Sequence, residues 1–268
     1  PRAVPVPEGR VTVERGCSVT DPKAFGPTMR ANDTTERPKR FYKQVSVSEA
    51  DGGFAVMLDG RTPKTPLGSK LIVPSQALAQ LMADEWAAQE EFIVLPSMGA
   101  TRLAYTVIDM VSKARAETAA EVGRYAGSDM VCYFAEAPEG LVKLQSEHWG
   151  PLLEWADTVL GLKLIKTHGI IHQPQPPEAL TKAEAMAAQL DDFSLAGLAF
   201  GASLFGSAVL AFALQMGQLS GESAHTLARL DQAFQEARWG IDDEAAARTA
   251  SMHGEALLLE RWFAALQG

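Results

Sequence analysis

The chain has 268 residues, of which 47% are hydrophobic and 21% charged, and its net charge at pH 7 is -9. This composition is typical of a folded globular protein with one large domain or two modest ones. The acidic balance argues against binding to nucleic acid or anionic lipid, because both depend on Lys and Arg. The two cysteines, Cys17 and Cys132, form no disulfide framework or zinc-knuckle pattern, and this usage suits a reducing compartment.

The first 38 residues are rich in Pro, Thr, Arg and Asp. They lack the apolar core of a secretory signal, and they mix Arg with Glu and Pro, unlike a transit peptide. We expect residues 1–38 to form a loose arm that need not belong to the natural protein. A short strand is expected at residues 10–14, and order in the arm would require a partner surface.

The segment after the arm has the pattern of a small antiparallel sheet. Alternating apolar and polar side chains predict a strand over residues 41–47, and apolar runs predict two more at residues 54–58 and 71–73. The Asp59-Gly60 pair is a two-residue hairpin signal, because glycine tolerates positive φ.

From Ser75 onward the spacing of apolar residues predicts helices, and Ser75 itself has the character of an N-cap. The later apolar stripes predict helices near residues 103–111, 141–160 (bent or broken at Gly150-Pro151), 178–190, 193–218, 221–240 and 242–266. We therefore expect an α+β fold. A small antiparallel β domain with one helix would span residues 39–95, and a larger all-helical domain would span residues 96–268.

One long stretch, FSLAGLAFGASLFGSAVLAFALQMGQLSG at residues 193–221, carries no charged side chain. Its length exceeds the roughly 20 apolar residues that span a bilayer, so a membrane-anchored scaffold is one interpretation. However, Asp191, Asp192 and Glu222 flank it, where an anchor normally has Lys or Arg. A helix that is apolar all round is also typical of the centre of a bundle, and we favour that buried helix. Its small residues would permit close helix crossing: Gly197, Gly201, Gly206 and Ser207.

The sequence contains no phosphate-binding glycine loop and no nucleophile elbow. His168 and His172 have the i, i+4 spacing of zinc ligands, but the residues around them favour a strand or loop without a third ligand. We expect no metal, no cofactor and no catalytic site. An enzyme with an unrecognised site that uses Asp109, Asp129 or His253 is the alternative.

The densest polar cluster is QEARWGIDDE, around Gly240. Gly240 is expected to end one helix and Asp242 to cap the next, with Asp243 and Glu244 favourable against the positive end of the helix dipole. Capping explains the acids but not Trp239. An aromatic side chain beside acids at an exposed helix corner is a reasonable anchor for a protein partner.

Several motifs follow one another in a specific order: RFYK at 40–43, LDGRTPKTP at 58–66, EWAAQ at 85–89, GSDMVCY at 127–133 and RWG at 238–240. In this order they resemble the assembly chaperones of the α subunit of the F-type ATP synthase. The resemblance covers almost everything that follows the arm.

The resemblance implies a non-enzymatic protein that binds the unassembled α subunit, prevents its aggregation and hands it over for assembly with the β subunit. We expect a soluble monomer that binds no nucleic acid and does not insert stably into membranes. It would act in the cytoplasm of a bacterium or in the mitochondrial matrix of a eukaryote. The expected partner-binding residues lie at the polar cluster: Trp239, Asp242, Asp243 and Glu244, with Glu236 as a second choice. The essential acid of the family would be Asp243 or its neighbour Glu244.

Two further expectations concern residues outside this cluster. The charged and aromatic side chains of the first two motifs are expected to hold the β domain together: Arg40, Phe41, Tyr42, Arg61 and Lys64. The family usually reads Met-Pro-Leu-Thr where this chain has Met98-Gly-Ala-Thr101, so we expect a more flexible loop at that place.

Overall fold

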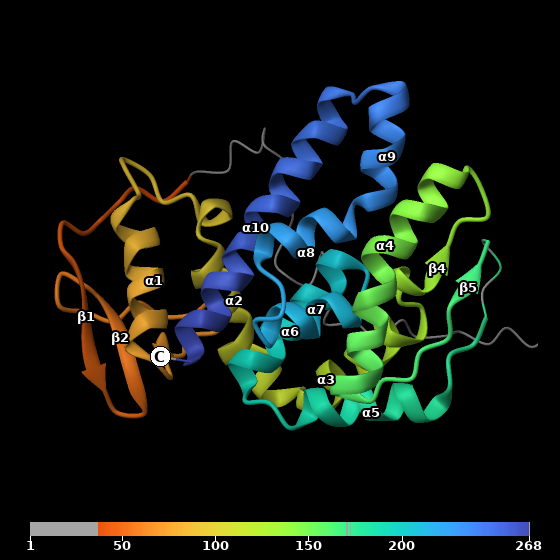
Figure 1. Ribbon diagram of the computed structural model, residues 1–268. Helices are drawn as coiled ribbons and strands as arrows, with labels where there is room; N and C mark the ends of the chain where they lie inside the picture. The colour runs from red at the N-terminus through yellow and green to blue at the C-terminus, as the bar shows by residue number, and fades with distance from the viewer. Residues whose placement is uncertain (1–36, 170, 172, 268) are drawn as a thin grey trace, which may run out of the picture.

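The structure is a computed structural model that describes residues 37–169, 171 and 173–267. A three-stranded antiparallel sheet with one helix against it is followed by a larger helical body (Figure 1). The α+β class expected from the sequence is therefore confirmed. The predicted arm, except for residues 37 and 38, lies outside the described residues, and so does the strand predicted within it.

The sheet has the strand order β1-β2-β3, with β1 at Val45–Ala50, β2 at Gly53–Leu58 and β3 at Ile72–Val73. Strands β1 and β2 pair from Val45↔Leu58 to Ala50↔Gly53. The predicted Asp59-Gly60 turn is present, with φ values of 47° and 77°, and it joins Leu58 to Arg61 through a pair of backbone hydrogen bonds.

The first strand begins four residues later than predicted. The carboxylate of Asp59 accepts the backbone N–H groups of Lys43 and Gln44, so this segment is bound to the turn before the ladder starts. The motif before it is bound to helix α1, Gln76–Ala87. The Tyr42 hydroxyl donates to the Trp86 carbonyl at 2.7 Å.

Arg40 lies over the Tyr42 ring, 4.7 Å from its centroid, and donates to the Gln89 carbonyl at the end of α1. Arg40 and Tyr42 therefore hold the β domain together, as expected. The Phe41 side chain is 71% exposed, and the side chains of Arg61 and Lys64 are also exposed, so their expected contribution to the β domain remains a prediction. Successive side chains of an extended segment point to opposite faces, so Phe41 faces away when its neighbours face α1.

The helical body continues through the rest of the chain. Its helices are α2 Gly99–Asp109, α3 Arg115–Gly127, α4 Glu139–Trp155, α5 Pro177–Ala188, α6 Asp192–Phe205, α7 Ala208–Gln215, α8 Gly221–Ala228, α9 Leu230–Trp239 and α10 Asp243–Gln267. Two short strands, β4 at Tyr133–Phe134 and β5 at Thr167–His168, pair in parallel beside them. Helix α4 is not broken at Pro151 but runs on to Trp155 and a π-helical turn at Ala156–Leu160.

The uncharged stretch forms two helices, α6 and α7, where one was predicted. Gly206 ends α6 in the left-handed region with φ 64°, and the Ser207 hydroxyl then caps α7 by accepting from the Leu210 N–H at 3.0 Å. Most of both helices is buried, so the predicted core position is confirmed. Within the described part of the chain, no helix combines the length and apolar character needed to cross a bilayer.

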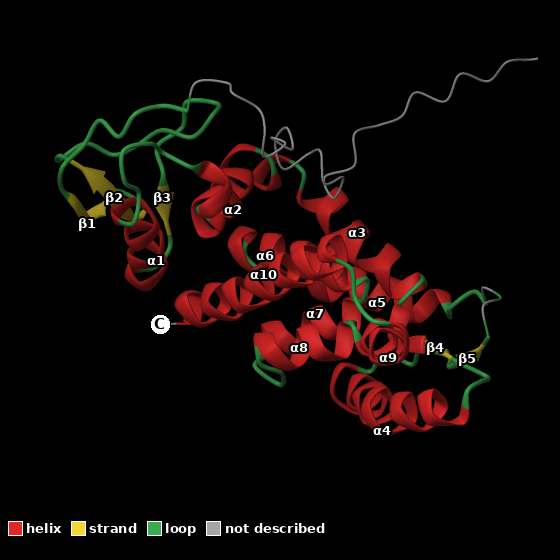
Figure 2. Ribbon diagram, turned by 90° about the horizontal axis from the view of Figure 1, so that it is seen from above, coloured by secondary structure: helices red, strands yellow, loops and turns green. Residues whose placement is uncertain are grey.

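Two glycines of α6 allow the close crossings that the sequence suggested. A β-carbon on Gly197 would lie 2.9 Å from the Phe263 ring and 3.0 Å from the Trp262 ring, both on α10. A β-carbon on Gly201 would lie 3.3 Å from Ala211 of α7. Figure 2 shows α10 running alongside α6, and this contact closes the centre of the helical body.

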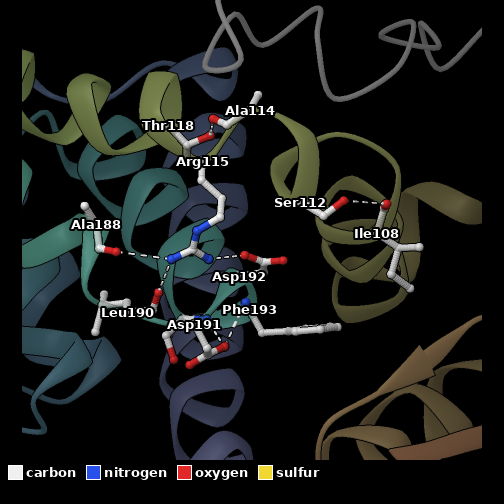
Figure 3. Close-up of polar contacts among 11 residues, drawn as sticks. Ile108, Ser112, Ala114, Arg115, Thr118, Ala188, Leu190, Asp191, Asp192 and Phe193 are labelled. Atoms are coloured by element: carbon white, nitrogen blue, oxygen red, sulfur yellow. Dashed lines mark hydrogen bonds and ion pairs between the residues drawn. The ribbon is translucent and has the colours of Figure 1, made fainter. Parts of the chain in front are cut away.

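The acids before the uncharged stretch are helix-terminus residues (Figure 3). The Asp191 carboxylate accepts the N–H groups of Phe193 and Ser194 at 2.9 and 3.0 Å, so it is the N-cap of α6. Asp192 pairs with Arg115 at the start of α3. The same guanidinium donates to two carbonyl groups at the end of α5, at 3.1 and 2.6 Å. Three helix ends are thereby fastened together.

The C-terminal half of α10 packs against the β domain and α2. The Ser75 hydroxyl donates to the Ala265 carbonyl at 2.5 Å, and a β-carbon on Gly99 would lie 2.4 Å from Leu258. The segment expected to be a flexible loop is instead the first turn of α2. Its N–H groups at Ala100 and Thr101 are accepted by the Glu85 carboxylate at 2.7 and 2.8 Å.

Candidate partner-binding site

Helices α9 and α10 form a helical hairpin whose tip stands out from the rest of the described molecule, at the top of Figure 1. Gly240 ends α9 with φ 84°, and its N–H donates to the Glu236 carbonyl at 2.8 Å. The Asp242 carboxylate accepts the Ala245 N–H at 2.7 Å and thus caps α10. Both capping predictions are confirmed, and the tip is a defined corner.

The corner exposes two large apolar side chains. Trp239 is 77% exposed and Ile241 is 51% exposed, which is unusual for side chains of this size. The prediction identified Trp239 but missed Ile241. The exposure of Ile241 could have been predicted from its position between the Trp-Gly pair and the acids, where an apolar side chain has no core to pack against.

The acids form one group at the start of α10. Asp242, Asp243 and Glu244 are all exposed, and Glu244 pairs with Arg248 at 2.5 Å on the next turn. Their negative charges lie at the positive end of the helix dipole, which favours them there. The corner therefore combines exposed apolar side chains with a negative rim, and we define it as Trp239, Ile241 and residues 242–244.

Glu236 lies in a different environment from the other predicted site residues. It pairs with Arg229, and both side chains are largely buried. Two residues further on, Arg238 lies over the Phe234 ring at 4.3 Å from its centroid. Glu236 thus stabilises the shape of α9 and does not belong to the exposed rim; its predicted role in binding remains a prediction.

The base of the hairpin is attached to α8 and α4. His253 of α10 lies 2.5 Å from the Glu222 carboxylate, and its ring contacts His225 with the centroids 5.0 Å apart. Burial, together with the nearby positive charges of His253 and Arg229, lowers the pKa of His225. The Gln145 amide of α4 donates to Asp231 at 2.8 Å. These contacts fix the direction in which the corner points.

The three residues named for the alternative enzyme each contact other residues of the protein. Asp109 accepts the Thr65 hydroxyl at 2.7 Å, in the loop between β2 and β3. Asp129 is buried and accepts the Val209 N–H at the start of α7, and burial raises its pKa to about 6. Neither shares its partners with His253. In the described part of the chain, no three His, Cys, Asp or Glu side chains are grouped as metal ligands would be. His172 lies outside the described residues.

Comparison with known proteins places the chain in a family. The protein-family model described as ATP12 chaperone protein matches residues 39–157 of this chain. The mitochondrial protein atp12 of Schizosaccharomyces pombe is 27% identical over 225 residues, which are 77% of this chain and 75% of that protein.

Two crystal structures extend the similarity through the helical body. Atp12 from Paracoccus denitrificans has a TM-score of 0.80 and 40% identity, covering 85% of this chain and 97% of that chain. The Atu1473 protein of Agrobacterium tumefaciens has a TM-score of 0.79 and 39% identity, covering 85% of this chain and 86% of that chain. The chain therefore belongs to the ATP12 chaperone family, whose members are assembly factors of the ATP synthase and not enzymes.

Proposed function

We propose that the protein binds the unassembled α subunit of the ATP synthase catalytic sector, prevents its aggregation and hands it over for assembly with the β subunit. Membership of the ATP12 family supports a chaperone of ATP synthase assembly. The motifs that resemble chaperones of the α subunit support that subunit as the client. The proposed site of contact is the corner of α9 and α10.

A single observation supports the corner most directly: Trp239 is 77% exposed on a rigid, capped helix junction. Exposed aromatic side chains that are held in place lose little conformational entropy on binding and are frequent anchors of protein interfaces. The neighbouring carboxylates would attract basic residues of the client and discourage acidic partners.

The same arrangement suits a partner that must later be released. An unassembled subunit exposes the interface that assembly will bury, and such surfaces aggregate. A chaperone has to cover that surface and still yield to the final neighbour, which favours a contact of moderate size with a polar rim. We propose that the protein acts as a monomer where the enzyme is assembled, in the bacterial cytoplasm or the mitochondrial matrix.

The proposal is tested by reversing the charge of the corner with the double variant Asp243→Lys and Glu244→Lys. The matched control is Glu90→Lys with Glu91→Lys, because these two acids are also adjacent and exposed but follow α1 in the β domain. Both variants change the net charge equally. We expect the corner variant to keep its circular dichroism spectrum and melting temperature and to stop suppressing aggregation of the isolated α subunit.

The control variant should suppress aggregation as the wild type does. Undiminished suppression by the corner variant would remove the corner from the proposal. A parallel pull-down with separately expressed subunits tests the client, and we expect capture of α and not of β. Capture of β alone would contradict the assignment of the α subunit.

A further inference from the structure

A groove with a volume of about 700 Å³ lies between α2, α6 and α10. Its apolar lining includes Leu103 of α2, Phe200 and Leu204 of α6, and Leu258 of α10. Arg102 and Glu255 lie at its polar side. This groove could not be predicted from the sequence, because the residues that line it come from segments that are distant along the chain.

Two charged groups of the groove make hydrogen bonds within the protein. Glu85, which also lines it, accepts two backbone N–H groups of α2. The Arg261 Nε donates to the Leu257 carbonyl. Burial raises the pKa of Glu255, and the positive charge of Arg102 opposes that shift. The apolar part of the lining is what an occupant would cover with apolar atoms.

The exposed face of α10 connects this groove to the corner. Four of the exposed residues of α10 are small and follow one another at helical spacing: Ala247, Ala250, Ser251 and Gly254. These residues follow Asp243 on the same face, and the last three line the groove. From Asp243 to Leu258 the face is about 22 Å long at 1.5 Å per residue. The corner and the groove are thus two ends of one surface.

Gly254 is not required by the packing of the protein itself. A β-carbon there would meet nothing within 4 Å, unlike one on Gly197 or Gly221. Glycine inside a helix is less favourable than alanine. Glycine, which has no side chain, therefore lies where the protein leaves open space. This open space allows a partner protein to approach the helix closely.

We propose that this surface binds an amphipathic helix of the client subunit, with a large apolar side chain in the groove and basic residues beside Asp243 and Glu244. The inference rests on the proposed function and specifies the binding mode of that function. A helix fits because small residues allow two helix axes to approach to about 8 Å. Laying the apolar face of a helix into a groove is also a recurrent mode of recognition.

The test fills the groove without disturbing the fold. Gly254→Leu adds an apolar side chain where the chain has room, and Gly254→Ala adds only a β-carbon. Ala116→Leu, on an exposed position of α3, is the control for added surface hydrophobicity. Affinity for the isolated α subunit is measured by surface plasmon resonance, with thermal melting of each variant as the check on folding.

We expect Gly254→Leu to melt no lower than wild type and to lose roughly thirtyfold in affinity, the size of a hot-spot substitution. Ala116→Leu should bind within about threefold of wild type, as residues outside a hot spot do, and Gly254→Ala should fall between wild type and Gly254→Leu. Wild-type affinity in a folded Gly254→Leu variant would overturn the groove and leave the corner and the proposed function intact. Failure of the wild type itself to bind α would instead overturn the proposed function. Sedimentation velocity adds one further outcome: a wild-type dimer that Gly254→Leu dissociates would make a second copy the occupant and overturn the inference.

Discussion

Alanine at Gly197 and alanine at Gly254 are expected to change stability in opposite directions. Both glycines lie inside helices, so either substitution gains about 0.5–1 kcal/mol from backbone entropy and helix propensity. At Gly254 nothing lies within 4 Å of the new β-carbon, so the gain remains. At Gly197 the β-carbon would lie 2.9 Å from Phe263 and 3.0 Å from Trp262, closer than the ordinary contact of about 3.5–4.0 Å.

The two rings cannot retreat easily. Trp262 and Phe263 are almost fully buried, and the Trp262 Nε1 donates to the Phe193 carbonyl at 3.1 Å. Overpacking of this kind costs about 1–3 kcal/mol. The net expectation is that Gly197→Ala destabilises the protein by about 1–2 kcal/mol, after subtraction of the helix-propensity gain. Gly254→Ala should stabilise it by about 0.5–1 kcal/mol.

Urea unfolding followed by circular dichroism measures both changes as shifts of the midpoint at constant m-value. Calorimetry should show the melting temperature of Gly197→Ala lowered by about 2–8 °C, at roughly 2–4 °C per kcal/mol for a chain of this size. Gly201→Ala, whose β-carbon would lie 3.3 Å from Ala211, should fall between the two. Equal stability of Gly197→Ala and Gly254→Ala would refute the close crossing of α6 and α10.

Three further predictions concern buried polar groups. Tyr42→Phe removes the hydrogen bond to the Trp86 carbonyl and should lower the free energy of unfolding by about 1 kcal/mol in urea titration; no change would contradict its role at α1. Asp109→Ala leaves the buried Thr65 hydroxyl without its acceptor and should cost about 1–3 kcal/mol by the same assay, whereas a neutral effect would argue against this link. Asp129 should titrate at about pH 6 in carbon NMR, above its usual 3.8, because it is buried. Since the folded pKa is the higher one, its contribution to stability is complete below about pH 4 and is lost as the pH rises through 6; titration below pH 4 would refute this.

Local signals predicted local structure well. The Asp59-Gly60 turn and the caps at Ser75 and Asp242 depend on a few neighbouring residues, and all three are present. The break at Gly206 was missed because this stretch is apolar on all sides. It has no alternation of apolar and polar residues whose period would be interrupted at the end of a helix. Its signal was the Gly-Ser pair, in which glycine ends one helix and serine caps the next.

Features that depend on tertiary packing were harder to predict. Helix α3 was not anticipated because its sequence, RAETAAEVGRYAG, is rich in Ala and has few large apolar residues to mark a stripe. The exposure of Phe41 depends on which face of its segment meets α1. The position of Trp239 at a corner could be predicted from the flanking caps, but the groove could not, because Arg102 and Leu258 meet only in the folded chain.

The position of α10 also has a consequence for biosynthesis. This helix supplies Leu259, Trp262 and Phe263 to the core and fastens Ser75 through the Ala265 carbonyl, yet it leaves the ribosome after every other described element. Until then the faces of α1 and α6 that it covers stay open, and long-range pairing of this kind delays folding. The nascent chain is thus itself a molecule with uncovered apolar surface, and that surface is covered only once α10 has been translated.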